Sequence, residues 1–184
     1  MRIKLYKPFE HWNLCGVIWV YSDPHFGDPD QKTMDSLWPD DNEQVRLINY
    51  NLSKNDTIIF LGDIGDASYI EKIKGYKVLI LGNHDKGASN YSMFDEVYEG
   101  PLMINDHVLL SHEPIDMGFG INIHGHDHGD MTIFHSNCVN INVCSNIVDF
   151  KKQRLDYLLN GVDYVDVHRL TIDKAIDRKR TKRV

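Results

Sequence analysis

Five short clusters of aspartate, asparagine and histidine residues stand directly after apolar runs in this chain. Asp23 and His25 follow residues 17–21, Asp63 follows 57–61, Asn83, His84 and Asp85 follow 76–81, His112 follows 107–110, and His126 and His128 follow 120–123. Carboxylate oxygens and imidazole nitrogens are common ligands of divalent transition metals. Because strand ends hold side chains on rigid supports, the five clusters predict one metal site along the edge of a sheet.

The spacing of these residues indicates how many ions the site takes. Asp23 and His25 are two residues apart, as are His126 and His128, so each pair lies on one side of an extended segment and can chelate one ion. The candidate ligands are Asp23, His25, Asp63, Asn83, His112, His126 and His128. Seven nitrogen and oxygen donors exceed the need of one ion and suit two ions about 3.5–4 Å apart that share a carboxylate.

The clusters also form a motif set. The patterns D-x-H, G-D-x-x-D, G-N-H-D, S-H and G-H-x-H occur in this order between Asp23 and His128, whereas no motif occurs after about residue 146. Together they resemble the calcineurin-like metallophosphoesterases, and the chain length and spacing resemble small bacterial and phage-type members without a cap domain. The resemblance implies an α/β fold, a four-layer α-β-β-α sandwich of two mixed sheets.

The resemblance implies two overlapping ligand sets. Asp23, His25, Asp63 and His128 would hold one ion, and Asp63, Asn83, His112 and His126 would hold the other, with Asp63 as the bridge. The implied cofactors are two divalent or trivalent ions, and mixed nitrogen and oxygen ligands suit Mn, Fe, Zn, Co and Ni alike. The implied reaction is hydrolysis of a phosphoester by a metal-bridging hydroxide, since metal ions lower the pKa of bound water to about 7.

His84 and Asp85 are the candidate catalytic residues next to these ligands. The resemblance makes His84 a proton donor to the phosphoryl oxygen or the leaving group, a role worth about 10²–10⁴-fold in rate. Asp85 is expected to orient the His84 imidazole, and capping of the following helical turn is the alternative role.

Four further residues near the clusters have simpler interpretations. Asp66 is expected to cap a helix, and a role at the metal site is the alternative. His124 is expected to be packed within a strand, and Asp127 points away from its histidine neighbours by strand alternation. Lys86 is interpreted as a solvated lysine, and contact with a substrate phosphate is the alternative.

Net charge narrows the substrate classes. The 184-residue chain has a formal net charge of −7 at pH 7, which disfavours nucleic acid and anionic membrane as partners. We therefore expect small phosphodiesters as substrates, with a nuclease or a phosphomonoesterase as alternatives. A catalytically silent binding scaffold is a third hypothesis, disfavoured because all seven ligands and His84 are present.

Composition predicts one folded domain over residues 1–184. The hydrophobic fraction is 42%, and the length suits a single core. The three cysteines form no C-x-x-C pair, which indicates reduced thiols and a cytoplasmic protein. No apolar run approaches the ~20 residues that would span a bilayer, so no membrane partner is expected. The oligomeric state is left open.

The order of elements supports an α/β fold. The predicted strands are 17–21, 57–61, 76–81, 95–98, 101–104, 107–110, 121–124 and 139–144. In the first half, strands alternate with helices after Asp41 and Asp66, which predicts parallel pairing. Residues 26–39 are predicted as a loop over the first cluster. A short helix is expected at 153–160 and a basic C-terminal helix at about 170–183.

Overall fold

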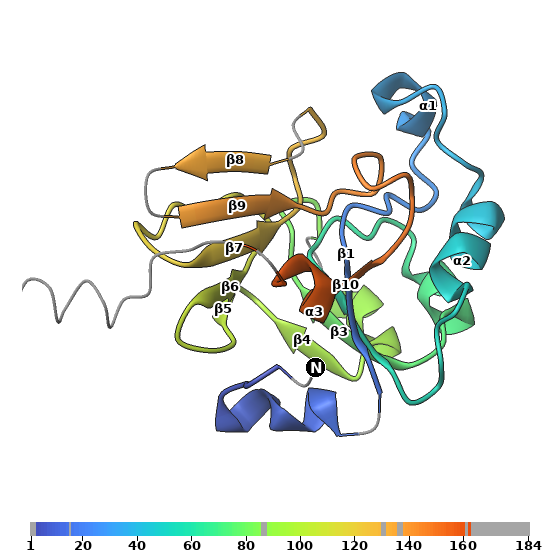
Figure 1. The fold of residues 1–184 in the computed structure, drawn as a ribbon. Helices are drawn as coiled ribbons and strands as arrows, with labels where there is room; N and C mark the ends of the chain where they lie inside the picture. The colour runs from blue at the N-terminus through green and yellow to red at the C-terminus, as the bar shows by residue number, and fades with distance from the viewer. Residues whose placement is uncertain are drawn as a thin grey trace, which may run out of the picture.

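The computed structural model describes residues 3–14, 16–85, 88–129, 132–135, 138–160 and 162. Ten strands in these segments form two five-stranded sheets, which are the framework of the molecule (Figure 1). The predicted strand ranges agree with eight of these strands to within two residues at each end.

The first sheet has the strand order β10-β1-β2-β3-β4. Its strands are β1 Ile18–Tyr21, β2 Thr57–Phe60, β3 Tyr76–Ile80, β4 Glu96–Tyr98 and β10 Gln153–Arg154. Strands β1 to β4 are parallel, as the alternation of strands and helices predicts, and β10 adds an antiparallel edge. All four residues of β2 are buried, which matches an apolar strand covered on both faces.

The second sheet has the order β5-β6-β7-β9-β8. Its strands are β5 Leu102–Met103, β6 Val108–Leu110, β7 Ile121–His124, β8 Thr132–His135 and β9 Cys138–Asn142. The three central strands are parallel, whereas β5 and β8 pair antiparallel at the two edges. Both sheets are therefore mixed.

The two sheets face each other across one hydrophobic core. Ile59 and Val78 of the first sheet belong to the same buried cluster as Leu110, Ile121 and Val139 of the second. Burying each such side chain contributes about 1.5–3 kcal/mol, so this shared layer holds the sheets together. The predicted α/β sandwich of two mixed sheets is confirmed.

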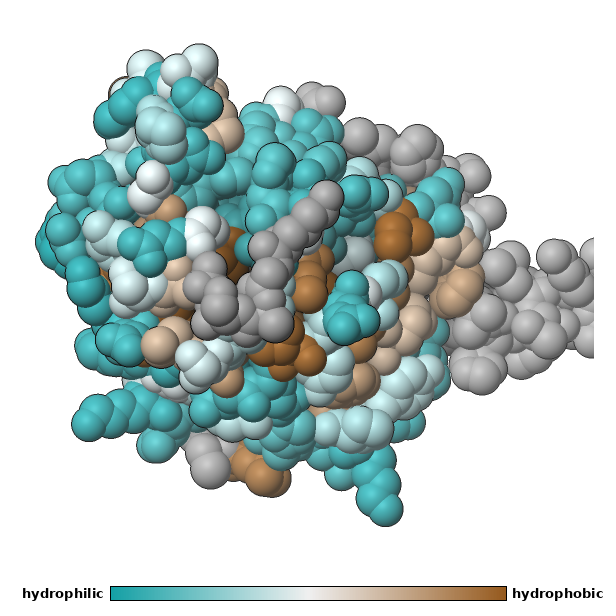
Figure 2. Space-filling view, turned by 180° about the vertical axis from the view of Figure 1, so that it is seen from behind, coloured by the Kyte–Doolittle hydropathy of each residue, from teal (hydrophilic) through white to brown (hydrophobic). Residues whose placement is uncertain are grey.

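Helices pack on the other face of the first sheet. Helix α2 (Asp41–Asn49) and the 3₁₀ helix η2 (Ala67–Lys72) contribute Ile48 and Ile70 to a second buried cluster, together with Phe60 of β2. Figure 1 shows α2 on the side of the molecule away from β7, β8 and β9. Seen from behind, the surface is mostly hydrophilic with a smaller hydrophobic area near its centre, as expected when the apolar residues gather between layers (Figure 2).

The helix caps agree with the sequence at one helix and differ by one residue at the other. Asp66 caps η2 as predicted, because its carboxylate accepts the backbone N–H of Ser68 at 2.9 Å. Helix α2 was predicted to start from a cap at Asp41, but the capping residue is Asp40, which accepts the N–H of Glu43 at 3.0 Å. Asp40 has the extended backbone that a capping residue requires, whereas Asp41 is already helical.

Several short elements differ from the predictions. The expected helix 153–160 is shorter, since residues 153 and 154 form β10 and only Leu155–Leu158 form α3. Short helices η1 (Lys7–Asn13) and η3 (Ala88–Met93), α1 (Gln31–Met34) within the predicted loop, and strand β8 were not predicted. The predicted basic helix at 170–183 lies outside the described residues. No helix in the described segments combines the length and apolar character needed to cross a membrane.

The topology brings the predicted clusters to one edge. Strands β1, β2 and β3 are parallel in one sheet, and β6, β7 and β9 are parallel in the other. A parallel bridge between Ser22 and Cys144 joins the chain just after β1 to the chain just after β9. The carboxyl ends of the two sets of strands therefore meet, and ligands from both sheets can converge there.

Candidate metal centre

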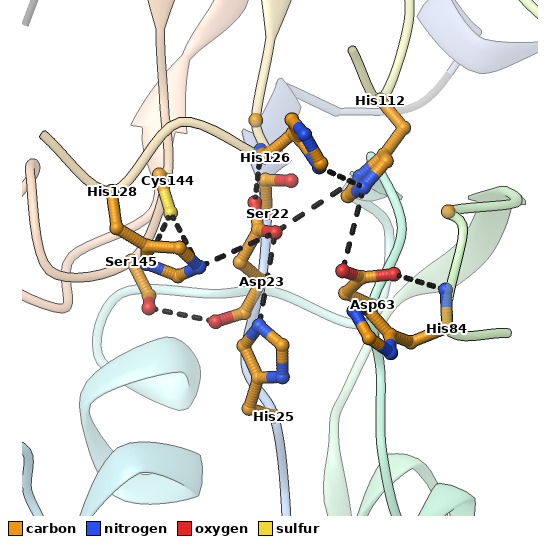
Figure 3. Close-up of polar contacts among 12 residues, drawn as sticks. Ser22, Asp23, His25, Asp63, His84, His112, His126, His128, Cys144 and Ser145 are labelled. Atoms are coloured by element: carbon orange, nitrogen blue, oxygen red, sulfur yellow. Dashed lines mark hydrogen bonds and ion pairs between the residues drawn. The ribbon is translucent and has the colours of Figure 1, made fainter. Parts of the chain in front are cut away.

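All seven predicted ligands lie in loops that follow strands, and the structure brings them together. Asp23 and His25 follow β1, Asp63 follows β2, Asn83 follows β3, His112 follows β6, and His126 and His128 follow β7. Figure 3 shows Asp23 among the side chains of His25, His112, His126 and His128, with Asp63 beside His112. The site therefore draws on both sheets.

Asp23 is the centre of one group of ligands. Its side chain is fully buried, and its Oδ1 has no hydrogen-bond partner, although it lies 3.9 Å from Nε2 of both His25 and His128. The buried Nε2 of His25 also lacks a partner. A buried anionic oxygen without a partner is costly, and a cation between these atoms would satisfy it. The residues present therefore fit a metal ion.

Asp63 connects this group to a second one. Its Oδ2 lies 3.4 Å from Nε2 of His112, and Nδ1 of His126 lies 3.2 Å from the same nitrogen. The potential ligand atoms of Asp63, His112 and His126 lie within 4.8 Å of one another, and the same is true of Asp23, His25 and Asp63. His126 and His128, which were expected to chelate one ion as a pair, fall in different groups, because His128 lies with Asp23. Asn83 joins the second group through its Oδ1, at 2.8 Å from His112.

Hydrogen bonds fix the orientation of two histidine rings. Nδ1 of His112 lies 2.7 Å from the carbonyl oxygen of Leu61, so Nδ1 carries the donated hydrogen and Nε2 faces Asp63. Nδ1 of His128 lies 3.0 Å from Oδ1 of Asn146, which leaves Nε2 facing Asp23. Metal-binding histidines are typically held this way, with one nitrogen hydrogen-bonded to an oxygen and the other directed at the ion.

The buried carboxylates of the site favour a positive charge close to them. Burial alone would lower the pKa of His112, but the carboxylates of Asp63 and Asp23 raise it to about 9. Burial opposes ionisation of Asp63, yet hydrogen bonds from His112 and from the His84 N–H lower the pKa of this carboxyl below its usual value. The two carboxylates thus favour a positive charge at the position of His112. A metal cation would supply the same charge more fully.

Backbone strain is concentrated in these loops. Asp23, His25, Asp63 and His126 have positive φ values of 55°, 46°, 51° and 65°. This conformation costs roughly 1–2 kcal/mol for a residue other than glycine, and such strain clusters at functional sites. Gly125 has a related role, because a side chain there would collide with Ser22 and with Oδ2 of Asp23.

Asp85 has a structural role that the sequence did not predict. Its carboxylate accepts three backbone N–H groups, from Gly82 at 2.8 Å, Asp63 at 2.8 Å and Ile64 at 2.9 Å. These bonds tie the loop after β2 to the loop after β3. None of these three bonds involves the His84 imidazole, and the turn that follows Asp85 begins at residues 86–87, outside the described residues, so the capping role stays a prediction. The Asp85 carboxylate thus fixes the backbone position of Asp63.

His84 lies at the solvent-exposed side of the centre. Its backbone N–H donates to Oδ1 of Asp63 at 2.9 Å, and its ring centroid is 6.2 Å from that of His25. The ring therefore stands beside the ligands with its nitrogens outside the two ligand groups. Its role as a proton donor stays a prediction.

The neighbouring residues behave largely as expected. His124 is buried, and its Nδ1 lies 2.8 Å from the carbonyl oxygen of Gly125, which is a packed strand histidine. Burial lowers its pKa. The carboxylate of Asp127 accepts the N–H of Gly129 at 3.0 Å, outside the ligand groups. Lys86 lies outside the described residues.

Three residues at the site were not predicted from the sequence. Sγ of Cys144 lies 3.1 Å from Nδ1 of His128, and the side chain of Asn146 orients the same imidazole ring. The third residue is the buried Trp38, whose ring centroid lies 6.0 Å from that of His25 and 5.9 Å from that of His128. Burial raises the pKa of the Cys144 thiol. A sequence signal did exist for Cys144 and Asn146, since the alternating apolar run 139–143 ends in Cys144, Ser145 and Asn146. This repeats the strand-then-polar-cluster pattern with a thiol in place of a carboxylate.

Comparison with known proteins supports the fold. No family model matches the chain, and no curated protein matches it. A protein of unknown function, AQ665 from Aquifex aeolicus, has a similar structure with a TM-score of 0.63 and 19% sequence identity, covering 79% of this chain and 99% of that one. YfcE, a phosphoesterase from E. coli, gives a TM-score of 0.40 and 14% identity, covering 69% of this chain and 78% of that one.

Proposed function

We propose that this chain is a dinuclear metal-dependent phosphoesterase. The observation that carries the proposal is the shared carboxylate: Asp63 belongs both to the group with Asp23 and His25 and to the group with His112 and His126. A carboxylate shared between two ligand groups is the arrangement found where two ions lie about 3.5–4 Å apart. Such pairs of ions serve displacement reactions at phosphorus.

The ligand set favours an anionic substrate. When bound, two divalent ions would supply positive charge to phosphoryl oxygens and lower the pKa of a water molecule to about 7. Among the predicted ligands only Asp23 and Asp63 are carboxylates, and the others are imidazoles and one amide. The two carboxylates leave part of the ionic charge uncompensated, and a phosphoester can offset the remainder.

Burial defines the direction from which a substrate approaches. Asp23, His25, Asp63 and His112 are buried, whereas Asn83, His84 and His126 are exposed. A phosphoester therefore reaches the centre past the exposed residues. His84 lies on this path, where its imidazole can give a proton to the departing oxygen.

The charges near the site favour a phosphodiester over a phosphomonoester. A dianionic monoester calls for an extra cationic clamp, commonly an arginine. Of the arginines in the described segments, Arg46 is bonded to Glu43 and Arg154 is bonded to Asp156. No arginine clamp is therefore evident among the described residues, and small phosphodiesters are the proposed substrates.

The test combines metal analysis with a generic assay. We expect the chain to bind two ions at saturating Mn²⁺ and to hydrolyse bis-p-nitrophenyl phosphate. Asp63→Asn should weaken both ions together, because the bridging carboxylate is lost, whereas His25→Ala should chiefly weaken one. At most one ion per chain at saturating Mn²⁺, and likewise at saturating Co²⁺ and Zn²⁺, would refute the dinuclear centre.

A further inference from the structure

Cys144 places a thiol at the edge of the metal centre. Cys144 lies two residues after the end of β9. A parallel β-bridge to Ser22 places it beside the loop that carries Asp23. Cys144 is fully buried, and its Sγ lies 3.9 Å from Nε2 of His128. The ligand atoms of Asp23, His128 and Cys144 lie within 4.8 Å of one another. Figure 3 shows the sulfur on the His128 side of Asp23.

A second observation at the same place points to a cation. Oδ1 of Asp23 is buried, has no hydrogen-bond partner, and lies 3.9 Å from Nε2 of His128 and 3.9 Å from Nε2 of His25. Nitrogen, oxygen and sulfur ligands of one tetrahedral ion are about 3.3–3.8 Å apart, given bond lengths of about 2.0–2.3 Å. Small side-chain movements would bring these atoms and the sulfur onto one ion.

The thiol is not needed to orient His128. Nδ1 of His128 is 3.0 Å from Oδ1 of Asn146, and the amide of Asn146 also donates to the His128 carbonyl oxygen at 3.0 Å. These two bonds already fix the ring. Orientation of the His128 ring therefore does not account for the position of Sγ, which lies 3.1 Å from Nδ1.

We propose that Cys144 is a sulfur ligand of the ion held by Asp23, His25 and His128. This inference rests on the metal centre of the proposed function. On binding, the sulfur–metal bond replaces the S–H bond, and the proton leaves to solvent. A thiolate favours zinc, cobalt and other thiophilic ions over manganese and magnesium, so Cys144 makes this position selective while the Asp63, His112 and His126 position is not.

Titration with Co²⁺ tests the sulfur ligand directly. A thiolate bound to Co²⁺ gives a ligand-to-metal charge-transfer band in the near ultraviolet, which nitrogen and oxygen ligands do not. We expect the band in the native chain and its loss in Cys144→Ser, while Co²⁺ still binds. The matched control is Cys138→Ser, because Cys138 is also buried but contacts the carbonyl oxygen of Ile115 instead of the site. This control should keep the band.

Metal preference gives a second readout. Cys144→Ser should weaken Zn²⁺ binding by about tenfold or more, the lower bound for residues that support a metal site. Mn²⁺ binding should change much less, since manganese gains little from sulfur. X-ray absorption of the native zinc-loaded chain needs no variant and should show a sulfur neighbour at about 2.3 Å.

Each contrary result has a distinct meaning. Co²⁺ bound without a charge-transfer band, or a band kept in Cys144→Ser, overturns the sulfur ligand while leaving the metal centre intact. Absence of bound Co²⁺, Zn²⁺ and Mn²⁺ in the native chain overturns the proposed function, and this inference with it.

Discussion

His84 differs from the candidate ligand histidines in its contacts, and from His25 and His112 in its exposure. His25 and His112 are buried within the ligand groups, whereas His84 is exposed and is linked to the site through its backbone N–H to Asp63. A side chain placed this way can transfer a proton without holding a metal. Its contribution should therefore depend on how much protonation the leaving group needs.

We predict that His84→Asn lowers turnover while two ions per chain stay bound. With a poor leaving group, as in diphenyl phosphate, the loss should reach about 10²–10⁴-fold. With bis-p-nitrophenyl phosphate the loss should be smaller, because p-nitrophenolate departs without a proton. Steady-state kinetics and metal analysis on the same samples make the comparison.

His107→Asn is the control for this prediction. His107 directly precedes β6, whereas the candidate ligand His112 follows the opposite end of that strand. It should leave both rates unchanged. Equal losses for the two leaving groups would mean that His84 positions the phosphate instead of protonating the product. Loss of metal would make it a ligand.

At the residue scale, the sequence predicted the members of the centre better than their contacts. The candidate ligands were identifiable because carboxylates and imidazoles follow apolar runs, and Asp63 does belong to two groups that could hold a metal ion. The bonds of Asp85 to three backbone N–H groups depend on how two loops approach each other, which no spacing within one loop reveals. The proximity of Cys144 to His128 likewise depends on the parallel pairing of β9 with β7, which places the segments after the two strands side by side.

At the scale of elements, the parallel strands were predictable and the short edge elements were not. Strands β1, β2 and β3 carry continuous apolar runs because they are covered on both faces. Strand β10 is only two residues long, and its pairing with Trp19 and Val20 of β1 decides its conformation. The strand propensity of the residues themselves cannot predict such a strand, because it forms only where the edge of β1 offers unpaired backbone groups.

The segment that leads into β10 contains a buried lysine. Lys152 is only 8% exposed, its Nζ lies 4.3 Å above the ring of Trp19, and it donates to the carbonyl oxygen of Tyr50. Burial lowers the pKa of Lys152 from 10.5 to about 8, although the charge of Asp56 opposes this shift. The packing of Lys152 against Trp19 and Tyr50 should therefore make the stability of the fold depend on pH.

We predict that this lysine makes the fold more stable as pH rises from about 8 to 10.5. Below pH 8, Lys152 is protonated in both states; within the window the unfolded chain keeps the proton and the folded chain releases it. The free energy of unfolding should gain about 2–3 kcal/mol across the window from this group. Lys152→Met should lose that gain, which denaturant unfolding at several pH values would measure.

The neighbouring Lys151→Met is the control, because Lys151 is exposed and lies 3.7 Å from Asp149 at the surface. It should retain the pH dependence of the native chain. Parallel pH profiles for the native chain and Lys152→Met would show that Lys152 keeps an ordinary pKa.

At the scale of the whole molecule, the sandwich explains why one edge carries the chemistry. The core lies between the sheets and the helices α2 and η2 cover the outer face of the first sheet, so the strand ends are where polar side chains can gather. Loops from both sheets meet there, and four of the candidate ligands have positive φ values where the loops converge. The order of strands and helices predicted this arrangement, whereas the number and lengths of the covering segments were not predictable.

The openness and charge of this edge determine which phosphoesters it suits. The nearest described segments are the loop with α1 and Trp38 on one side and the exposed Asn83 and His84 on the other. Contacts with remote parts of a substrate provide much of the specificity for the reacting centre. The described segments beside the candidate site offer few such contacts. Activity should therefore be broad and modest among small phosphodiesters.

We predict that kcat/KM for bis-p-nitrophenyl phosphate at least equals that for p-nitrophenyl phosphate in the metal-loaded chain. Two divalent ions, two carboxylates and one hydroxide leave about one positive charge, which matches a singly charged diester better than a dianionic monoester. The two described arginines do not offset the mismatch in this structure, because Arg46 is paired with Glu43 and Arg154 with Asp156. Parallel kinetics with both esters, on one preparation with two ions per chain, measure the ratio. A monoester preference above about tenfold, equivalent to roughly 1.4 kcal/mol of transition-state stabilisation, would contradict the charge argument and require a cationic clamp at the site.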